Sequence, residues 1–385
     1  MLAISGLAFL WYFLVPALGA ALSRRQWRRF RERFNRLRLR PLLRSRDYWR
    51  GAGGETWRFL GELESASEGR VLWARADNVT VPVFLDRADV CLLPRDGPGL
   101  PDPSEGAPER IGWDRARELG EGTKVFVGGL MERRDGRLGF VSSREDPLVV
   151  IFYDCPDREL AARTAWAGRG GGEYLNRLTP YSLALGAACL LFMAAYYLPR
   201  PAFRPVSAVA AIAALAPLFP LAPPGVLLTA AYRRLAWHSR LLRARCDLAR
   251  SPLLYLPDPG AGGKAGRLGP EGALPDGERY GFSRHAGIPP GALEGEIPLI
   301  VPEAAARGGE GWLVFGALPP GAALPERAGD PFAVFGALPG DPGKLAARFL
   351  AKAYALEALA WLLLLAGVAL NAVILWNVVA AAWPG

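Results

Sequence analysis

Four long apolar runs constrain this chain more than any other feature of its sequence. Residues 2–22 contain no charged side chain, and neither do residues 181–198, 205–232 or 358–384. About 20 consecutive apolar residues in a helix span the hydrocarbon core of a bilayer. The sequence therefore predicts an integral membrane protein with four α-helical spans.

The four expected spans divide the chain into eight segments. The spans cover residues 1–22, 179–198, 205–231 and 353–384. Between them lie two basic juxtamembrane segments (23–50 and 232–254) and two larger domains (51–178 and 255–352). A cleaved signal peptide is the alternative for the first run, because small residues occupy 17–22. We favour an uncleaved anchor, since no basic residue precedes the run and an arginine cluster follows it.

The basic residues are concentrated beside the spans, and this predicts the orientation of the chain. Its net charge is +9, but residues 23–50 alone carry twelve Arg against Glu32 and Asp47. Residues 232–250 carry six Arg against one Asp. Positive charge marks the cytoplasmic side of a membrane. Both termini are therefore expected outside and both domains in the cytoplasm, in a multi-pass protein of the inner (plasma) membrane.

The first large domain is expected to be all-β. Short runs rich in Val, Leu, Phe and Trp alternate with Gly, Asp, Asn and Pro, as in strands joined by turns. The expected strands are 56–63, 70–77, 79–86, 124–130, 137–142 and 148–154. The insertion at 94–122 is expected to be a loop with one helical turn near 114–119. Five or six such strands suit a small OB-like barrel or a sandwich.

An internal duplication is the feature that organises the remaining sequence. The segments VFVGGL (125–130), EDPLVV (145–150) and DRELAAR (157–163) are followed by LVFGAL (313–318), GDPFAV (329–334) and DPGKLAAR (341–348). The offsets are 188, 184 and 185 residues. Each half would then be a span, a basic segment, a small all-β domain and a second span. The second β domain, residues 255–352, is expected to be the more degenerate copy.

The two basic segments have the pattern of helices that lie on a membrane surface. Trp27, Phe30, Phe34 and Leu37 form one apolar stripe on a helix otherwise rich in Arg. Such helices place aromatic rings at the acyl boundary and Arg on anionic headgroups. A topology determinant without further role is the alternative. The expected membrane-surface residues are Arg24, Arg25, Trp27, Arg28, Arg29, Phe30, Phe34, Arg233, Arg234 and Trp237.

The third span is unusual because prolines interrupt it. Proline removes a backbone donor and clashes with the preceding turn, so this helix should be kinked or broken. Broken helices bind ions at transport sites, but a kink satisfied by neighbouring helices is the simpler interpretation. The candidate helix-contact or pore residues are Pro217, Pro220, Pro223, Pro224 and Asn371.

No motif of catalysis or cofactor binding occurs in the sequence. A Walker loop, a G-x-S-x-G elbow and an H-E-x-x-H pair are all missing. Four Cys and two His, with no close cysteine pair, give neither a disulfide framework nor a zinc site. We therefore expect no catalytic residue, no metal and no cofactor. Residues 51–178 sum to −5, which disfavours nucleic acid as a partner.

One known family shares the order of these elements. The chain runs from a span into a domain ending in G-x-x-V-x-V-x-G, a Pro-Leu turn and an acidic-Leu-Arg stretch, then a second span. The corresponding residues are Gly122, Val125, Val127, Gly129, Pro147, Leu148, Glu159, Leu160 and Arg163. Residues 55–198 thus resemble the membrane-flanked β domain of GIDE-type proteins. The resemblance implies a membrane-side interaction module; ligase activity does not carry over, because a RING needs eight Cys or His ligands.

These features favour a non-enzymatic scaffold or adaptor over other functions. Two membrane-apposed β domains would bind anionic lipid headgroups or an unidentified protein partner. A small transporter or channel component that uses the third span is the alternative. A membrane enzyme with an unrecognised site is the third possibility.

Overall fold

The computed structural model describes most of the chain as two units. It describes residues 2–38, 40–51, 53–93, 109–134, 136–144, 147–169, 174, 176–255, 271–273, 279–285, 312–317 and 336–382. The helical unit comprises residues 1–27, 168–243 and 350–385. The β unit comprises residues 28–167 and 244–349. Three helices, α2, α8 and α9, run from one unit into the other.

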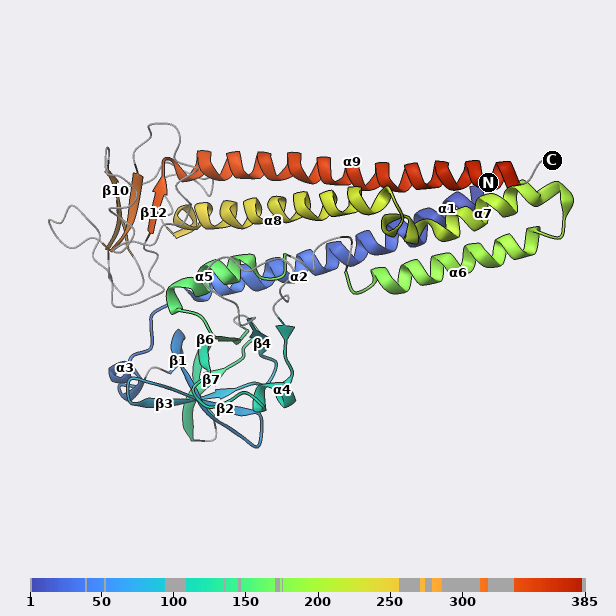
Figure 1. Cartoon of the computed structure of the whole chain (residues 1–385). Helices are drawn as coiled ribbons and strands as arrows, with labels where there is room; N and C mark the ends of the chain where they lie inside the picture. The colour runs from blue at the N-terminus through green and yellow to red at the C-terminus, as the bar shows by residue number, and fades with distance from the viewer. Residues whose placement is uncertain are drawn as a thin grey trace. The chain divides into compact units, whose positions relative to one another are not determined.

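Four stretches of helix are long and apolar enough to cross a membrane. They cover Leu2–Leu37, Thr179–Tyr197, Pro201–Leu221 and Pro342–Ala381 (Figure 1). Their elements are α1 (Leu2–Phe9), η1 (Leu10–Leu14), α2 (Val15–Leu37), α6 (Thr179–Tyr197), η3 (Pro201–Phe203), α7 (Arg204–Leu215), η4 (Ala216–Leu221) and α9 (Pro342–Ala382). The prediction of four membrane-spanning helices is therefore met in length and composition.

Helices α1, α6 and α7 pack through small side chains. Ile4, Leu190 and Ala210 belong to one buried cluster. A Cβ added to Gly186 of α6 would lie 2.7 Å from the Cβ of Trp11, so only glycine permits this close approach. The Ser207 hydroxyl donates to the Ala194 carbonyl over 2.7 Å. Close backbone approach and hydrogen bonds of this kind hold helices together in lipid, where apolar burial alone gives little preference.

Helix α8 (Gly225–Tyr255) packs along α9 in the same way. A Cβ on Gly367 would lie 3.4 Å from the Cα of Gly225. Further along, Ala360 is buried against α8, and the Ser239 hydroxyl donates to the Ala353 carbonyl over 2.9 Å. The α9 contacts at 353, 360 and 367 recur every seven residues, which keeps one face of a helix on its neighbour.

The third apolar run differs from the single kinked span at 205–231 that the sequence suggested. Helix α7 ends at Leu215, η4 continues to Leu221, and α8 begins at Gly225 after a non-helical connection. The prolines at 217, 220, 223 and 224 all fall in η4 or in this connection. Proline cannot donate the hydrogen bond that an α-helix interior requires, so the α-helix is replaced here rather than bent.

The β unit contains a closed barrel of five strands. They are β1 (Thr56–Ser67), β2 (Val71–Ala76), β3 (Val79–Phe84), β6 (Lys124–Arg134) and β7 (Arg137–Val141). Their order is β1-β2-β3-β7-β6, and β6 pairs back to β1. The β3–β7 pair is parallel and the other pairs are antiparallel. All five had been predicted from their alternation of apolar and polar residues.

Additional elements extend one side of the barrel. Strand β8 (Val149–Tyr153) pairs with β6, β4 (Asp89–Leu92) pairs with β8, and β5 (Glu109–Arg110) pairs with β4. The predicted helical turn forms as α4 (Trp113–Arg117). The sequence did not predict β4, β5 or α5 (Asp157–Trp166). The barrel interior is filled by buried side chains such as Phe59, Phe140 and Met131.

A second sheet lies in the later part of the β unit. Its strands are β9 (Glu271–Ala273), β10 (Arg279–His285), β11 (Trp312–Ala317) and β12 (Gly336–Pro339), in the order β12-β11-β10-β9. The neighbouring pairs are antiparallel. The rest of the second predicted β domain, including the loop expected at 257–277, lies largely outside the described residues.

The two barrel cysteines are expected to resist alkylation in the folded protein. Burial raises the pKa of Cys91 to about 12 and that of Cys155 to about 11, so little reactive thiolate forms at pH 8. Iodoacetamide followed by mass spectrometry should leave both unmodified until the protein is denatured. Because a raised pKa favours the neutral thiol, this contribution to stability is full below pH ~8.5 and falls as the pH rises towards 11. Rapid labelling of the native protein would contradict this prediction.

Candidate membrane-surface site

Helix α2 and the helices before it present three different surfaces in succession. Residues 2–22 are uncharged and mostly exposed, as the surface of a span should be. Arg24, Arg25, Arg28 and Arg29 follow, and all four are exposed. The last turns of α2 then enter the hydrophobic packing of the β unit.

The aromatic stripe of this segment faces the barrel. Phe30 and Phe34 are each 1% exposed, and the Phe34 ring meets Phe126 of β6 edge-on at 5.2 Å. A Cβ on Gly128 would lie 3.0 Å from Leu37. The expected insertion of Phe30 and Phe34 into the acyl boundary is therefore wrong. The stripe is buried by protein because β6 offers an apolar outer face that a sequence pattern cannot reveal.

Trp27 occupies an intermediate position on the same helix. It is half-buried, and a Cβ on Gly168 would lie 2.0 Å from its ring. Gly168 has a φ of +69° and directly follows α5 and Ala167. The Ala167 carbonyl accepts a hydrogen bond of 2.6 Å from Arg31. One arginine of the segment therefore binds protein backbone rather than remaining available to headgroups.

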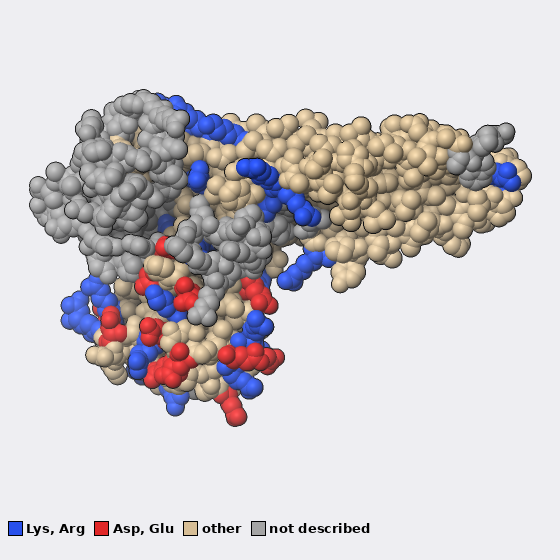
Figure 2. Space-filling view, viewed as in Figure 1, with Lys and Arg blue, Asp and Glu red and all other residues tan. Residues whose placement is uncertain are grey.

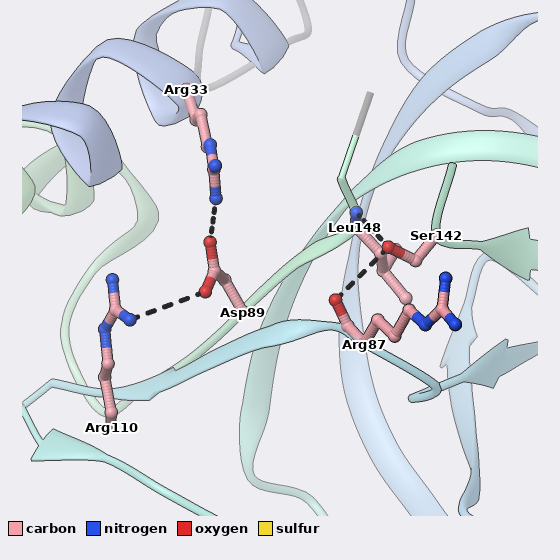
Figure 3. A network of polar contacts seen from close by, with 6 residues as sticks. All are labelled: Arg33, Arg87, Asp89, Arg110, Ser142 and Leu148. Atoms are coloured by element: carbon pink, nitrogen blue, oxygen red, sulfur yellow. Dashed lines mark hydrogen bonds and ion pairs between the residues drawn. The ribbon is translucent and has the colours of Figure 1, made fainter. Parts of the chain in front are cut away.

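A polar network also fixes α2 to the barrel (Figure 3). The Asp89 carboxylate, at the start of β4, binds Arg33 of α2 and lies 3.7 Å from Arg110 of β5. Close by, the Ser142 hydroxyl donates to the Arg87 carbonyl and accepts from the Leu148 amide, both over 3.3 Å. None of these contacts had been predicted. An Arg inside an Arg-rich segment gives no sign of which carboxylate it will reach.

The second basic segment lies on α8. Arg233 and Arg234 are exposed, as predicted for headgroup-binding residues. Trp237 is half-buried, and its ring lies 4.6 Å from that of His238. Leu241 is also half-buried and Ala244 is fully buried, so the apolar stripe of this helix faces protein as well.

Glu357 of α9 joins the two basic helices within the helical unit. It binds Arg243 of α8 and lies 3.7 Å from Arg24 of α2. The Arg243 guanidinium also lies over the Tyr354 ring, 5.0 Å from its centroid. Next to this cluster, Trp361 meets Tyr174 at 5.9 Å and Tyr232 at 6.0 Å. Aromatic rings beside arginines are typical of the membrane–water interface.

The charge of the helical unit is concentrated at this level. The unit's sequence contains eleven Lys and Arg but only two acidic residues. Arg200 and Arg204, between α6 and α7, are the two cations at the opposite ends of those helices. Figure 2 shows a long surface without charge between the two basic regions. We name the four exposed residues Arg24, Arg25, Arg233 and Arg234 the arginine collar.

The proline-containing break is closed by a side chain from α9. The Asn371 amide donates to the Phe219 carbonyl over 2.8 Å and to the Ala222 carbonyl over 3.0 Å. Asn371 is only 5% exposed, and a Cβ on Gly225 would lie 2.5 Å from its Nδ2. Two carbonyls released by the break are thus bound by protein. Asn371 had been predicted as a helix-contact residue, but its partners had not.

Comparison with family models, curated proteins and solved structures yields no match to this chain. Function must therefore be inferred from the geometry alone. Within the described residues, no group of three or more His, Cys, Asp or Glu is placed to hold a metal ion. The arginine collar and the barrel surface are the features from which a function can be argued.

Proposed function

We propose that this protein is a non-enzymatic membrane scaffold whose arginine collar binds anionic lipid headgroups and whose barrel is held at the cytoplasmic surface. One observation carries the proposal. A single continuous run of helix, Leu2–Leu37, leads from an uncharged span through exposed Arg to side chains buried in the barrel. Lipid, headgroup and domain contacts follow one another along one element.

The placement of charge supports the orientation that the sequence suggested. Arg24 and Arg243 meet at Glu357, so the basic ends of α2 and α8 share one side of the helical unit. Cations collect on the cytoplasmic side of membrane proteins. We accordingly infer that the N- and C-termini lie outside and that the barrel lies in the cytoplasm of a bacterial-type cell.

The barrel's strand order supports an OB-like assignment. A Greek-key barrel of five strands, closed by the parallel β3–β7 pair, is the arrangement expected of that fold. We also propose that the module is similar to the GIDE-type β domain. Two of the residues that carry this resemblance are in contact, since a Cβ on Gly129 would lie 2.7 Å from Leu148.

Strand pairing also supports the proposed duplication. Val127 of β6 lies opposite Val150 of β8, and the corresponding Phe315 of β11 lies opposite Gly336 of β12. The sequence offsets place the partner of Phe315 at residue 334 or 335, within two residues of the observed one. Helices α5 and α9, which follow these strands, begin 185 residues apart, the offset of the repeated Leu-Ala-Ala-Arg motif.

The collar is tested by removing two of its charges. In vesicles of phosphatidylcholine with a minor fraction of phosphatidylglycerol, the variant Arg233→Gln/Arg234→Gln should show a roughly 10- to 30-fold weaker preference for phosphatidylglycerol. Each cation near an anionic surface contributes about 1 kcal/mol, so two contribute about 2 kcal/mol. Spin-labelled phosphatidylglycerol measures the lipid immobilised at the protein.

The matched control is Arg200→Gln/Arg204→Gln, which removes two exposed arginines from the opposite side of the helical unit. Reporters fused after residues 60 and 202 verify that every variant keeps its orientation. The proposal requires that only the collar variant lose lipid preference. Equal losses in both variants, or no loss in either, would refute it.

A further inference from the structure

The surface of the barrel carries one conspicuous apolar side chain. Trp49 ends the short helix α3 (Ser45–Trp49) and is 76% exposed. Every other exposed large hydrophobic side chain in the described part of the protein belongs to the helical unit, where spans would face lipid. An exposed Trp on an otherwise polar domain is unusual, because burying such a ring is strongly favourable.

Helix α3 is pinned to the barrel, so this exposure is built in. Leu43, just before the helix, is 5% exposed in the barrel core, and its amide donates to the Arg58 carbonyl over 2.8 Å. The Ser45 hydroxyl donates to the Asp77 carbonyl over 3.2 Å. The Tyr48 hydroxyl donates to the Leu138 carbonyl of β7 over 3.1 Å.

The neighbouring ring of Tyr48 supports Trp49 from beneath. The two rings meet edge-on at 5.4 Å, and Tyr48 itself packs on the barrel core. Burial raises the pKa of Tyr48, consistent with a neutral hydroxyl engaged at the barrel surface. A rigid aromatic side chain loses little conformational freedom on binding, which favours its use as an interface anchor.

Arginines surround the exposed ring. Arg44, Arg46 and Arg50 are all exposed, and the single acidic residue on α3, Asp47, lies 3.9 Å from Arg46. This cluster is positive, although residues 51–178 sum to −5. Trp and Arg are the residue types most enriched at the energetic centres of protein interfaces.

We propose that Trp49, Arg44, Arg46 and Arg50 form the docking site for a protein partner that offers an apolar pocket rimmed by Asp and Glu. The charge of the cluster sets the acidic rim, and the lone projecting ring sets the pocket. A nucleic acid is disfavoured because its phosphates would meet the negative remainder of the domain. This inference rests on the scaffold function proposed above and adds the chemistry of the partner.

The test places the photo-crosslinking residue p-benzoylphenylalanine at position 49 of the full chain in living cells of the native host. The matched control places it at Arg117, which is exposed on α4, another five-residue helix of the same barrel. Adducts should form at position 49 on one protein, at a peptide rich in Asp and Glu. The changes Arg44→Gln and Arg50→Gln, and added salt, should lower the yield severalfold.

With that protein purified, Trp49→Ala should weaken binding at least 30-fold, as expected for a hot-spot tryptophan. Unchanged melting of the full chain excludes misfolding. No adduct, adducts on lipid or nucleic acid, or equal adducts at positions 49 and 117 would each overturn the proposal. The collar assay is independent, because Trp49→Ala should keep the preference for phosphatidylglycerol. Failure of the lipid proposal is therefore distinguishable from failure of this one.

Discussion

Replacing Phe34 with Ala should lower the free energy of unfolding of the barrel by about 3–5 kcal/mol. The ring is 1% exposed and meets Phe126, itself fully buried, at 5.2 Å. Truncation removes the transfer free energy of the ring and leaves a cavity between α2 and β6. Pulse proteolysis of the full chain in detergent across a urea series measures the loss.

Two further variants make this result specific. Arg29→Ala changes an exposed residue of the same helix and should cost less than 0.5 kcal/mol. Phe34→Leu keeps most of the apolar volume and should recover more than half of the stability. If Phe34→Ala unfolds like the wild type, the contact of α2 with the barrel contributes nothing to stability, and the proposed scaffold loses its structural basis.

Replacing Asn371 with Leu should destabilise the helical unit by about 1–3 kcal/mol. The change preserves side-chain volume but removes both hydrogen bonds to the carbonyls of Phe219 and Ala222. Within a membrane these groups have no water to replace the lost donor. Thermal unfolding in detergent, followed by size-exclusion chromatography with fluorescence detection, measures the effect.

Asn377 provides the matched control for this change, because it lies on the same helix and is exposed. Asn377→Leu should leave the melting temperature unchanged or raise it. The pair also addresses the alternative of a transporter or channel. A site that uses the broken span for ions needs unoccupied carbonyls at the break, whereas Asn371 already binds two of them. If Asn371→Leu melts like the wild type, its bonds do not stabilise the break.

The elements that form by local rules were predictable from the sequence. The strands around Val81, Val127 and Ile151 follow from short β-rich runs between turn residues, and each forms near its expected bounds. The spans follow from length and apolar content. Strand β4 was not predicted, because its four residues, Asp89–Leu92, are too few to show a period.

The candidate sites depended on partners distant in the chain. The stripe of Phe30 and Phe34 predicted correctly that one face of α2 is apolar, but not that β6 covers it instead of lipid. Either environment satisfies the same periodicity, since the hydrophobic effect has no direction. Trp49 gave no signal at all, because the exposure of a ring depends on whether another element covers it.

The sequence by itself determined the number of spans, the first β domain and the concentration of arginine beside the spans. These properties depend on residues close together in the chain. The tertiary structure decided which arginines remain exposed, how Asn371 closes the proline break, and that Trp49 projects from the barrel. Those outcomes depend on contacts between residues as far apart as 219 and 371, whose geometry exists only after the chain has folded.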